Sequence, residues 1–194
     1  PELQRGDEQP SRLAAGDEKI SQFLNLSSFA EYMLVHEHTV AKIREDMPLD
    51  RAALIGCGVT TGVGAVIHTA RVEAGSTVAV IGCGGVGLSA INGALIAGAS
   101  RIIAIDMLPS KLELARKFGA TDVVNASEVD AVQAVRELTK GGVHYSFEAI
   151  GLAQTAQQAF KMLGFGGTAT IIGMIPVGTH IELHGPEFLM ERKM

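Results

Sequence analysis

The chain has 194 residues, of which 47% are hydrophobic, 19% charged and 5% aromatic, with a net charge of −5. This length suits one to two domains, and the composition excludes a disordered polar chain. No dense run of Lys and Arg offers a binding surface to nucleic acid. Glycine is in excess, and eleven of the 23 glycines lie between Gly56 and Gly98, which indicates a local need for unusual backbone geometry.

Membrane insertion and disulfide bonding are not expected. The longest apolar stretch, residues 77–99, contains six glycines, so we expect no run of the roughly 18 to 20 apolar residues that a membrane helix needs. Residues 1–19 are polar and carry both charge signs, which is not typical of a signal peptide. Two cysteines, Cys57 and Cys83, are too few for a disulfide framework. We therefore expect a cytoplasmic protein that does not contact membranes.

The N-terminal part of the chain has a weak pattern. Residues 1–19 have no hydrophobic period and predict a loop or a disordered terminus. Residues 29–43 predict two short strands on either side of a His-Glu-His turn. Residues 48–71 predict a helix in two pieces, separated by a bend at Gly56-Cys57-Gly58.

From Ser76 onward, short β-branched apolar runs alternate with amphipathic stretches of about helical length. The apolar runs predict buried strands over residues 77–81, 101–105, 122–124, 143–148 and 168–172. The stretches between them predict helices over residues 84–97, 109–118, 129–139 and 153–163. Alternating strands and helices predict an α/β fold with a doubly wound parallel sheet.

A glycine motif, G-x-G-x-x-G, spans Gly82 to Gly87 between the first predicted strand and the helix that follows it. Asp106 ends the second predicted strand, 19 residues after Gly87, close to the spacing of about 20 that dinucleotide-binding units show. The glycines allow a tight turn and a close approach to a pyrophosphate, while the acid can accept hydrogen bonds from ribose hydroxyls. The motif therefore predicts dinucleotide binding.

Two other interpretations of this motif stay open on the residues alone. A plain α/β turn with a surface aspartate has the same spacing. A methyltransferase also combines a glycine-rich first turn with an acid after the second strand.

Cys57 lies between glycines ahead of this unit, and a single cysteine is more often a small buried residue than a ligand or nucleophile. Its surroundings, however, extend into a longer pattern: FLNLSSFAEYMLVHEHTVAKI, LIGCGVTTGVGAV, GCGGVGL, IIAID, KFGATDVVN, GGVHYSFEAIG and TIIGMIP follow one another in this order. Together these segments resemble the zinc-dependent alcohol dehydrogenases of the medium-chain dehydrogenase/reductase superfamily, in particular the branch with the class III and related bacterial enzymes. The resemblance covers about residues 20–194.

The resemblance implies a role for individual residues. Cys57 matches the third protein ligand of the catalytic zinc, and the family's other zinc ligands lie in a domain that precedes the matched region. The residues expected to bind NAD are Thr61, Gly82, Gly84, Gly85, Val86, Gly87, Asp106, Lys111, Ile150, Gly173 and Met174. Residues 1–47 are then a small β-rich remnant of the catalytic domain, and residues 48–194 are a coenzyme-binding domain truncated at its C-terminus.

The activity implied is reversible hydride transfer between a primary alcohol, or a hemithioacetal, and NAD, with zinc present only in the longer parent enzyme. The fragment alone is expected to be inactive. A zinc-free reductase of the quinone-reductase type and a non-catalytic NAD-binding module remain alternatives. His36 and His38 form an H-x-H pair without a third donor nearby, so we assign no metal to them.

Assembly and partners are the last expectations from the sequence. Residues 179–184 predict a short edge strand that pairs with the same strand of a second subunit in a homodimer, with Phe188, Leu189 and Met190 beside the axis. The partner expected in the active site is a small alcohol or aldehyde.

Overall fold

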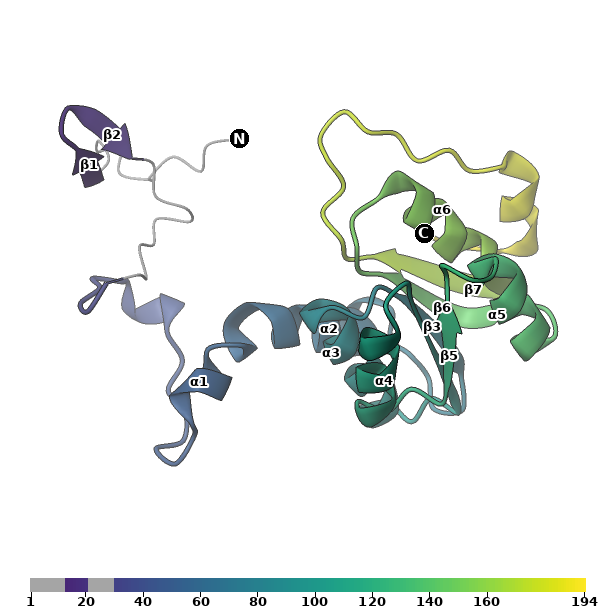
Figure 1. The fold of residues 1–194 in the computed structure, drawn as a ribbon, viewed down its shortest axis with the longest axis horizontal. Coiled ribbons are helices and arrows are strands. Elements are labelled where there is room, and N and C mark those ends of the chain that lie inside the picture. Colours follow the sequence, from purple (N-terminus) through teal and green to yellow (C-terminus); the bar gives the residue numbers. More distant parts are fainter. Residues whose placement is uncertain (1–12, 21–29) are drawn as a thin grey trace. The chain divides into compact units, whose positions relative to one another are not determined.

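The computed structural model describes residues 13–20 and 30–194 of the chain. The chain divides into two units, residues 1–47 and residues 48–194. Figure 1 shows the second unit as a sheet with helices on both of its faces.

In the first unit, residues 13–20 form a β-hairpin instead of the predicted loop. Strand β1 (Leu13–Ala15) pairs antiparallel with β2 (Glu18–Ile20), and Gly16 in the turn has φ +62°. Glycine adopts this left-handed conformation without steric cost, which permits a two-residue turn. The predicted loop at residues 1–12 lies outside the described residues. The strands expected in this unit are therefore present, but they lie at residues 13–20 and not at the predicted positions.

The prediction of two strands over residues 29–43 is wrong for the described residues 30–43. They hold one short 3-10 helix, η2 (Glu37–Thr39), and no strand. The His38 backbone N–H donates to Nδ1 of His36 over 3.2 Å, so this histidine caps the helix. Residues of high β-propensity form a strand only where a partner pairs with them.

Residues 49–69 form one nearly continuous helical stretch made of α1 (Leu49–Ala52), η3 (Ile55–Val59), α2 (Thr60–Gly64) and η4 (Ala65–Thr69). The predicted bend at Gly56–Gly58 is wrong, because these residues lie inside η3, a π-helical turn. By length and composition alone the stretch Leu49–Thr69 is apolar enough to cross a membrane, which corrects the expectation that no such run exists. One such helix is weak evidence for a membrane span, because helices of globular proteins meet the same criterion.

The sheet of the second unit has five parallel strands in the order β5-β4-β3-β6-β7. The strands are β3 (Thr77–Ile81), β4 (Arg101–Asp106), β5 (Asp122–Asn125), β6 (Val143–Glu148) and β7 (Leu163–Ile171). The helices between them are α3 (Gly85–Ile96), α4 (Pro109–Lys117), α5 (Ala131–Thr139) and α6 (Ala153–Lys161). The predicted doubly wound parallel sheet is confirmed.

The two faces of the sheet carry separate cores because strand residues alternate between them. Val78 and Val80 of β3 pack on one face with side chains of α3 and α4, and Ala79 and Ile81 pack on the other with α5 and α6. The strand order reverses between β3 and β6. From β3 the chain continues to β4 and β5 on one side of β3, and then to β6 and β7 on the other side of β3. Ligands of such sheets bind outside the carboxyl ends of the strands at this reversal.

After β7 the chain contains no further long strand. The predicted strand at residues 179–184 does not form, since the described chain offers it no pairing partner, and the short helix η5 (Gly185–Met190) follows. The Phe188 ring packs on Phe160 with ring centroids 4.9 Å apart. Lys193 then pairs with the edge of β7 at Thr168. The C-terminal segment thus returns to the sheet over part of the β7 edge.

Candidate functional site

The turn after β3 has a backbone that side chains would obstruct. Gly82 has φ +94°, and a Cβ there would lie 2.6 Å from Cγ1 of Ile150. A Cβ on Gly87 would lie 1.7 Å from the carbonyl oxygen of Gly82. The first turn of α3 therefore presses directly against the end of β3, which is possible only because both positions are glycine.

Gly84 and Gly85 differ from these two because a Cβ on either would meet nothing within 4 Å. Gly84 is the N-cap of α3 and makes no side-chain cap. The N–H groups of the first turn, which includes Gly85, Val86 and Gly87, have no partner inside a helix and carry the positive end of its dipole. The open space beside them suits a pyrophosphate that approaches the backbone closely.

Asp106, at the end of β4, is held in a fixed orientation beside this turn. Its Oδ2 accepts a hydrogen bond from the Cys83 backbone N–H over 2.8 Å. Its Oδ1 accepts from the backbone N–H groups of Met107, over 2.8 Å, and Leu108, over 3.1 Å. Cys83 and Asp106 lie 23 residues apart in sequence, and their hydrogen bond joins the glycine turn and the acid into one unit. Its position is the one where an acid can accept hydrogen bonds from ribose hydroxyls.

Lys111 lies close to this acid. Its Nζ is 3.9 Å from Oδ2 of Asp106, and its side chain is about half exposed. Lys111 stands in the first turns of α4, which starts directly behind the loop after Asp106. A cation is therefore present near the predicted ribose position.

The loops after β6 and β7 meet at the same edge of the sheet. Ile150 reaches the glycine turn, since its Cγ1 would be 2.6 Å from a Cβ on Gly82. A Cβ on Gly151 would lie 2.7 Å from the carbonyl oxygen of Met174, and one on Gly173 would lie 2.1 Å from the Gly151 nitrogen. Gly173 and Met174 are thus brought beside Ile150, although Met174 exposes 90% of its surface.

Thr61 and Val86 lie on helices that pack closely together. A Cβ on Gly62 of α2 would lie 2.3 Å from the carbonyl oxygen of Val86 in α3. Thr61 lines a groove of about 430 Å³ between this helical stretch and the end of β7, together with residues that the sequence did not single out. These additional lining residues include His68, Thr170 and Ile172. No spacing rule links them in the sequence, because they come from different elements.

The two cysteines have opposite environments. Cys57 in η3 is exposed, whereas Cys83 in the glycine turn is buried. Burial first, and then the nearby charge of Asp106, raises the pKa of the Cys83 thiol to about 12. Cys83 is therefore a neutral thiol at physiological pH and acts as a small packing residue, while its backbone N–H binds Asp106.

A complete zinc centre cannot be built from the residues that the structure describes. Cys57 is the residue that the sequence resemblance assigns to zinc, but within the described ranges no group of three His, Cys, Asp or Glu side chains could hold a metal ion. One thiolate does not satisfy a four-coordinate site. These residues alone therefore do not fit the metal.

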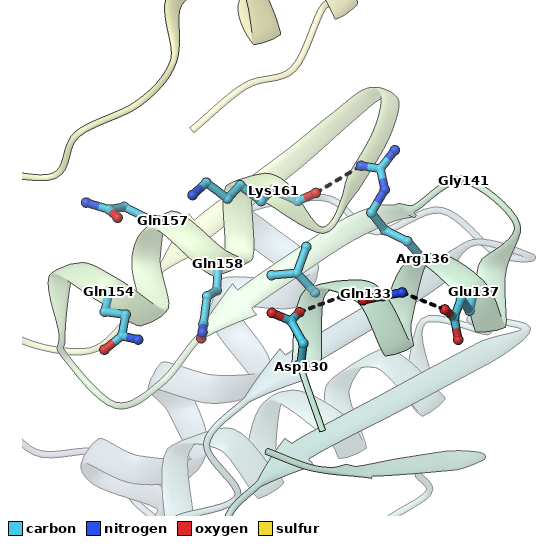
Figure 2. A pocket seen from close by; sticks show the side chains of 10 residues that line it. Asp130, Gln133, Arg136, Glu137, Gly141, Gln154, Gln157, Gln158 and Lys161 are labelled. Atoms are coloured by element: carbon cyan, nitrogen blue, oxygen red, sulfur yellow. Dashed lines mark hydrogen bonds between the residues drawn. The ribbon is translucent and has the colours of Figure 1, made fainter. Parts of the chain in front are cut away.

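A second groove, of about 780 Å³, runs between α5 and α6. Figure 2 shows its polar lining, which consists of Asp130, Gln133, Arg136, Glu137, Gln154, Gln157, Gln158 and Lys161, and Val132 and Gly141 complete the lining. Nη1 of Arg136 donates to the Lys161 carbonyl over 3.1 Å and so links the two helices. The lining holds two cationic and two anionic side chains, so the groove offers no net charge to a phosphate, and it contains none of the predicted coenzyme residues.

The chain matches a known protein family and curated relatives. The family model described as zinc-binding dehydrogenase matches residues 85–193, which is more than half of the chain. The chain is 45% identical over 174 residues to "Probable S-(hydroxymethyl)glutathione dehydrogenase 1" from Schizosaccharomyces pombe, a match that covers 89% of this chain and 46% of that protein. The chain therefore spans about half the length of this relative.

Solved structures agree with the sequence match. Benzyl alcohol dehydrogenase from Acinetobacter calcoaceticus superimposes with a TM-score of 0.83 and 37% identity, over 86% of this chain and 46% of that one. A zinc-binding dehydrogenase from Sinorhizobium meliloti 1021, solved bound to NADP, gives a TM-score of 0.67 and 33% identity, over 71% and 41%. The fold and the order of its elements are thus those of known dehydrogenase structures.

Proposed function

Because the chain belongs to the zinc-binding dehydrogenase family, we propose that residues 48–194 are the NAD-binding domain of a zinc-dependent alcohol dehydrogenase. The enzyme would transfer a hydride between a primary alcohol, or a hemithioacetal, and NAD. Residues 1–47 would belong to the catalytic domain of the same protein. The names of the relatives, an S-(hydroxymethyl)glutathione dehydrogenase and a benzyl alcohol dehydrogenase, support the alcohol and hemithioacetal substrate classes.

The observation that carries this proposal is the hydrogen bond between the Cys83 N–H and Asp106. It joins a turn with open backbone at Gly84 and Gly85 to a carboxylate with fixed orientation. In this arrangement the turn would bind the pyrophosphate, and Asp106 would accept the hydroxyl hydrogens of the adenosine ribose. Both groups are preorganised, so little ordering is needed when the coenzyme binds.

The remaining predicted residues would orient the two ends of the coenzyme. Ile150 would pack beside the adenine, while Thr61, Val86 and the backbone of Gly173 and Met174 would position the nicotinamide. The coenzyme supplies the hydride chemistry, and the protein supplies its position relative to the substrate carbon. Cys57 would contribute one ligand to a zinc site completed by residues outside this set.

Coenzyme selectivity tests this proposal. Each negative charge of a 2′-phosphate about 4 Å from the Asp106 carboxylate would cost at most about 4 kcal/mol at an effective dielectric near 20. Lys111 offsets part of that cost, since it lies 3.9 Å from the same carboxylate. We expect calorimetric titration to show at least about tenfold tighter binding of NAD than of NADP, a difference of about 1.4 kcal/mol. Asp106→Ala should reduce the difference in affinity between NAD and NADP by weakening the binding of NAD. Equal affinities for the two coenzymes in the unaltered chain would refute the role of Asp106 in binding the ribose.

We also propose that the protein forms a homodimer through residues 179–184. Two observations support it: this segment has no strand partner within the described chain, and Leu189, close by in sequence, exposes 84% of its surface. Pairing with the same segment of a second copy would give each segment a strand partner around a twofold axis. Light scattering should give twice the mass of a single chain. A monomer with rapid hydrogen exchange across residues 179–184 would contradict the proposal.

A further inference from the structure

Glu148, the last residue of β6, is a carboxylate with no exposed surface. Acidic side chains are almost never fully buried unless they are paired. Its Oε1 accepts three hydrogen bonds: from the Ile150 N–H over 2.9 Å, from the Gly151 N–H over 2.8 Å and from the Thr155 hydroxyl over 2.7 Å. Its Oε2 is buried and has no hydrogen-bond partner within the described residues. The two oxygens therefore have different functions in the fold.

The backbone of the same residue holds a second loop. The carbonyl oxygen of Glu148 accepts from the N–H groups of Ile172, over 2.8 Å, and Gly173, over 3.0 Å. One residue thus binds the loop after β6 through its side chain and the end of β7 through its main chain. These two segments are the ones that carry Ile150 and Gly173.

The Oε2 atom lies against the second of these segments. A Cβ on Gly173 would be 2.6 Å from Oε2 and 2.6 Å from Cα of Gly151. The loops therefore touch through their backbones, with the carboxylate filling the space directly beside Gly173. A change at Oε2 is transmitted to Gly173, because close-packed atoms leave no free volume to absorb it.

We propose that Glu148 is a positioning residue that sets the location of Gly173 and Met174 relative to the glycine turn, and thereby the position of the nicotinamide half of the coenzyme. This inference rests on the proposed function. The ADP half would be held by Gly84, Gly85, Asp106 and Ile150. Of these four, Ile150 is the one that hydrogen-bonds to the Glu148 side chain, and it donates to Oε1 and not to the Oε2 atom beside Gly173. The two halves of the coenzyme should therefore respond differently to a change at Glu148.

Glu148→Gln distinguishes the role of Oε1 from that of Oε2. The amide oxygen can keep the three donors of Oε1, while the NH2 group replaces Oε2 and brings two hydrogens against Gly173. We expect the dissociation constant of NAD to rise about fivefold, because two amide hydrogens without an acceptor are placed against Gly173, and that of ADP-ribose to rise less than about twofold. The ratio of the two constants is a readout that a merely structural role would not change.

Two further variants complete the experiment on the 194-residue chain. Thr155→Val removes one donor to Oε1 and should raise the same ratio by a smaller factor, which keeps the test informative if Glu148→Gln does not fold. Asp122→Asn makes the matched carboxylate-to-amide change on β5 and should leave the ratio unchanged. An unchanged ratio in a folded Glu148→Gln, or in Thr155→Val if Glu148→Gln does not fold, would overturn the inference. Failure of the unaltered chain to bind NAD would instead overturn the proposed function on which it rests.

Discussion

Two glycines of the same turn should respond to alanine in opposite ways. In Gly87→Ala the new Cβ would start 1.7 Å from the Gly82 carbonyl oxygen. A normal C···O contact is about 3.3 Å, so α3 and the end of β3 must separate by about 1.5 Å. Because both elements belong to the core, we expect a cost near the upper end of overpacking, about 3 kcal/mol.

In Gly84→Ala the new Cβ would meet nothing within 4 Å, and the backbone at φ −77° suits alanine. The free energy of unfolding should change by no more than about 1 kcal/mol. The methyl group would, however, occupy the space proposed for the pyrophosphate. We therefore expect NAD affinity to fall by at least about tenfold.

Thermal unfolding followed by circular dichroism, together with calorimetric titration of NAD, measures both effects. Gly87→Ala should lower Tm by about 6–12 °C, at about 2–4 °C per kcal/mol for a domain of this size. Gly84→Ala should unfold close to the parent temperature and lose binding. A Gly87→Ala variant as stable as the parent would refute the packing described for the turn. Unchanged NAD affinity in Gly84→Ala would refute the phosphate position.

Two titratable side chains give further predictions. Cys83 has a folded pKa of about 12, above the ordinary thiol value of about 8.5, so its contribution to stability is complete below the unfolded pKa and is lost as pH rises toward the folded one. In denaturant unfolding, the free energy of unfolding of Cys83→Ala should therefore fall less at alkaline pH than that of the unaltered chain. Iodoacetamide at neutral pH should modify Cys57 before Cys83, and equal rates of modification would contradict the buried environment of Cys83. The Arg101 guanidinium, which donates to both oxygens of Asp122 over 2.8 and 3.1 Å, lowers the pKa of that carboxyl. The stabilisation by this pair is therefore present above the pKa of Asp122 in the unfolded chain, and it is lost as pH falls through the lowered pKa of the folded chain. Asp122→Asn should make the free energy of unfolding less dependent on pH on the acid side, and an unchanged pH dependence would show that the pair contributes nothing to stability.

The sheet of the second unit was predictable because its signals are local and repeated. Val78 and Val80 face one core while Ala79 and Ile81 face the other, so β3 reads as a continuous apolar run. The glycine motif was also predictable from local signals. Gly82 and Gly87 each answer a steric demand of the turn, whereas Gly84 has open space beside it. The β1–β2 hairpin also had a signal, the Gly16-Asp17 pair, but its strands are only three residues long.

The features that the sequence did not predict depend on partners distant in the chain. Residues 30–43 and 179–184 have residue types suited to strands, but a strand forms only where another pairs with it, and the described chain offers no such partner. Two of the three donors to Glu148, the Ile150 and Gly151 N–H groups, come from a loop whose path no spacing rule specifies, and the third is Thr155 in the first turn of α6. The proximity of Lys111 to Asp106 follows from where α4 starts, and helix boundaries are the least certain part of a sequence-based prediction.

Whether the glycine turn and Asp106 bind NAD can be seen by locating the coenzyme on the chain. Amide ¹⁵N–¹H spectra recorded during an NAD titration should show saturable shifts at Gly84, Gly85 and Val86. The amides of Gln154 and Gln158, in the groove between α5 and α6, should not move. Shifts confined to that groove, with the turn unaffected at saturation, would exclude the glycine turn as the NAD site.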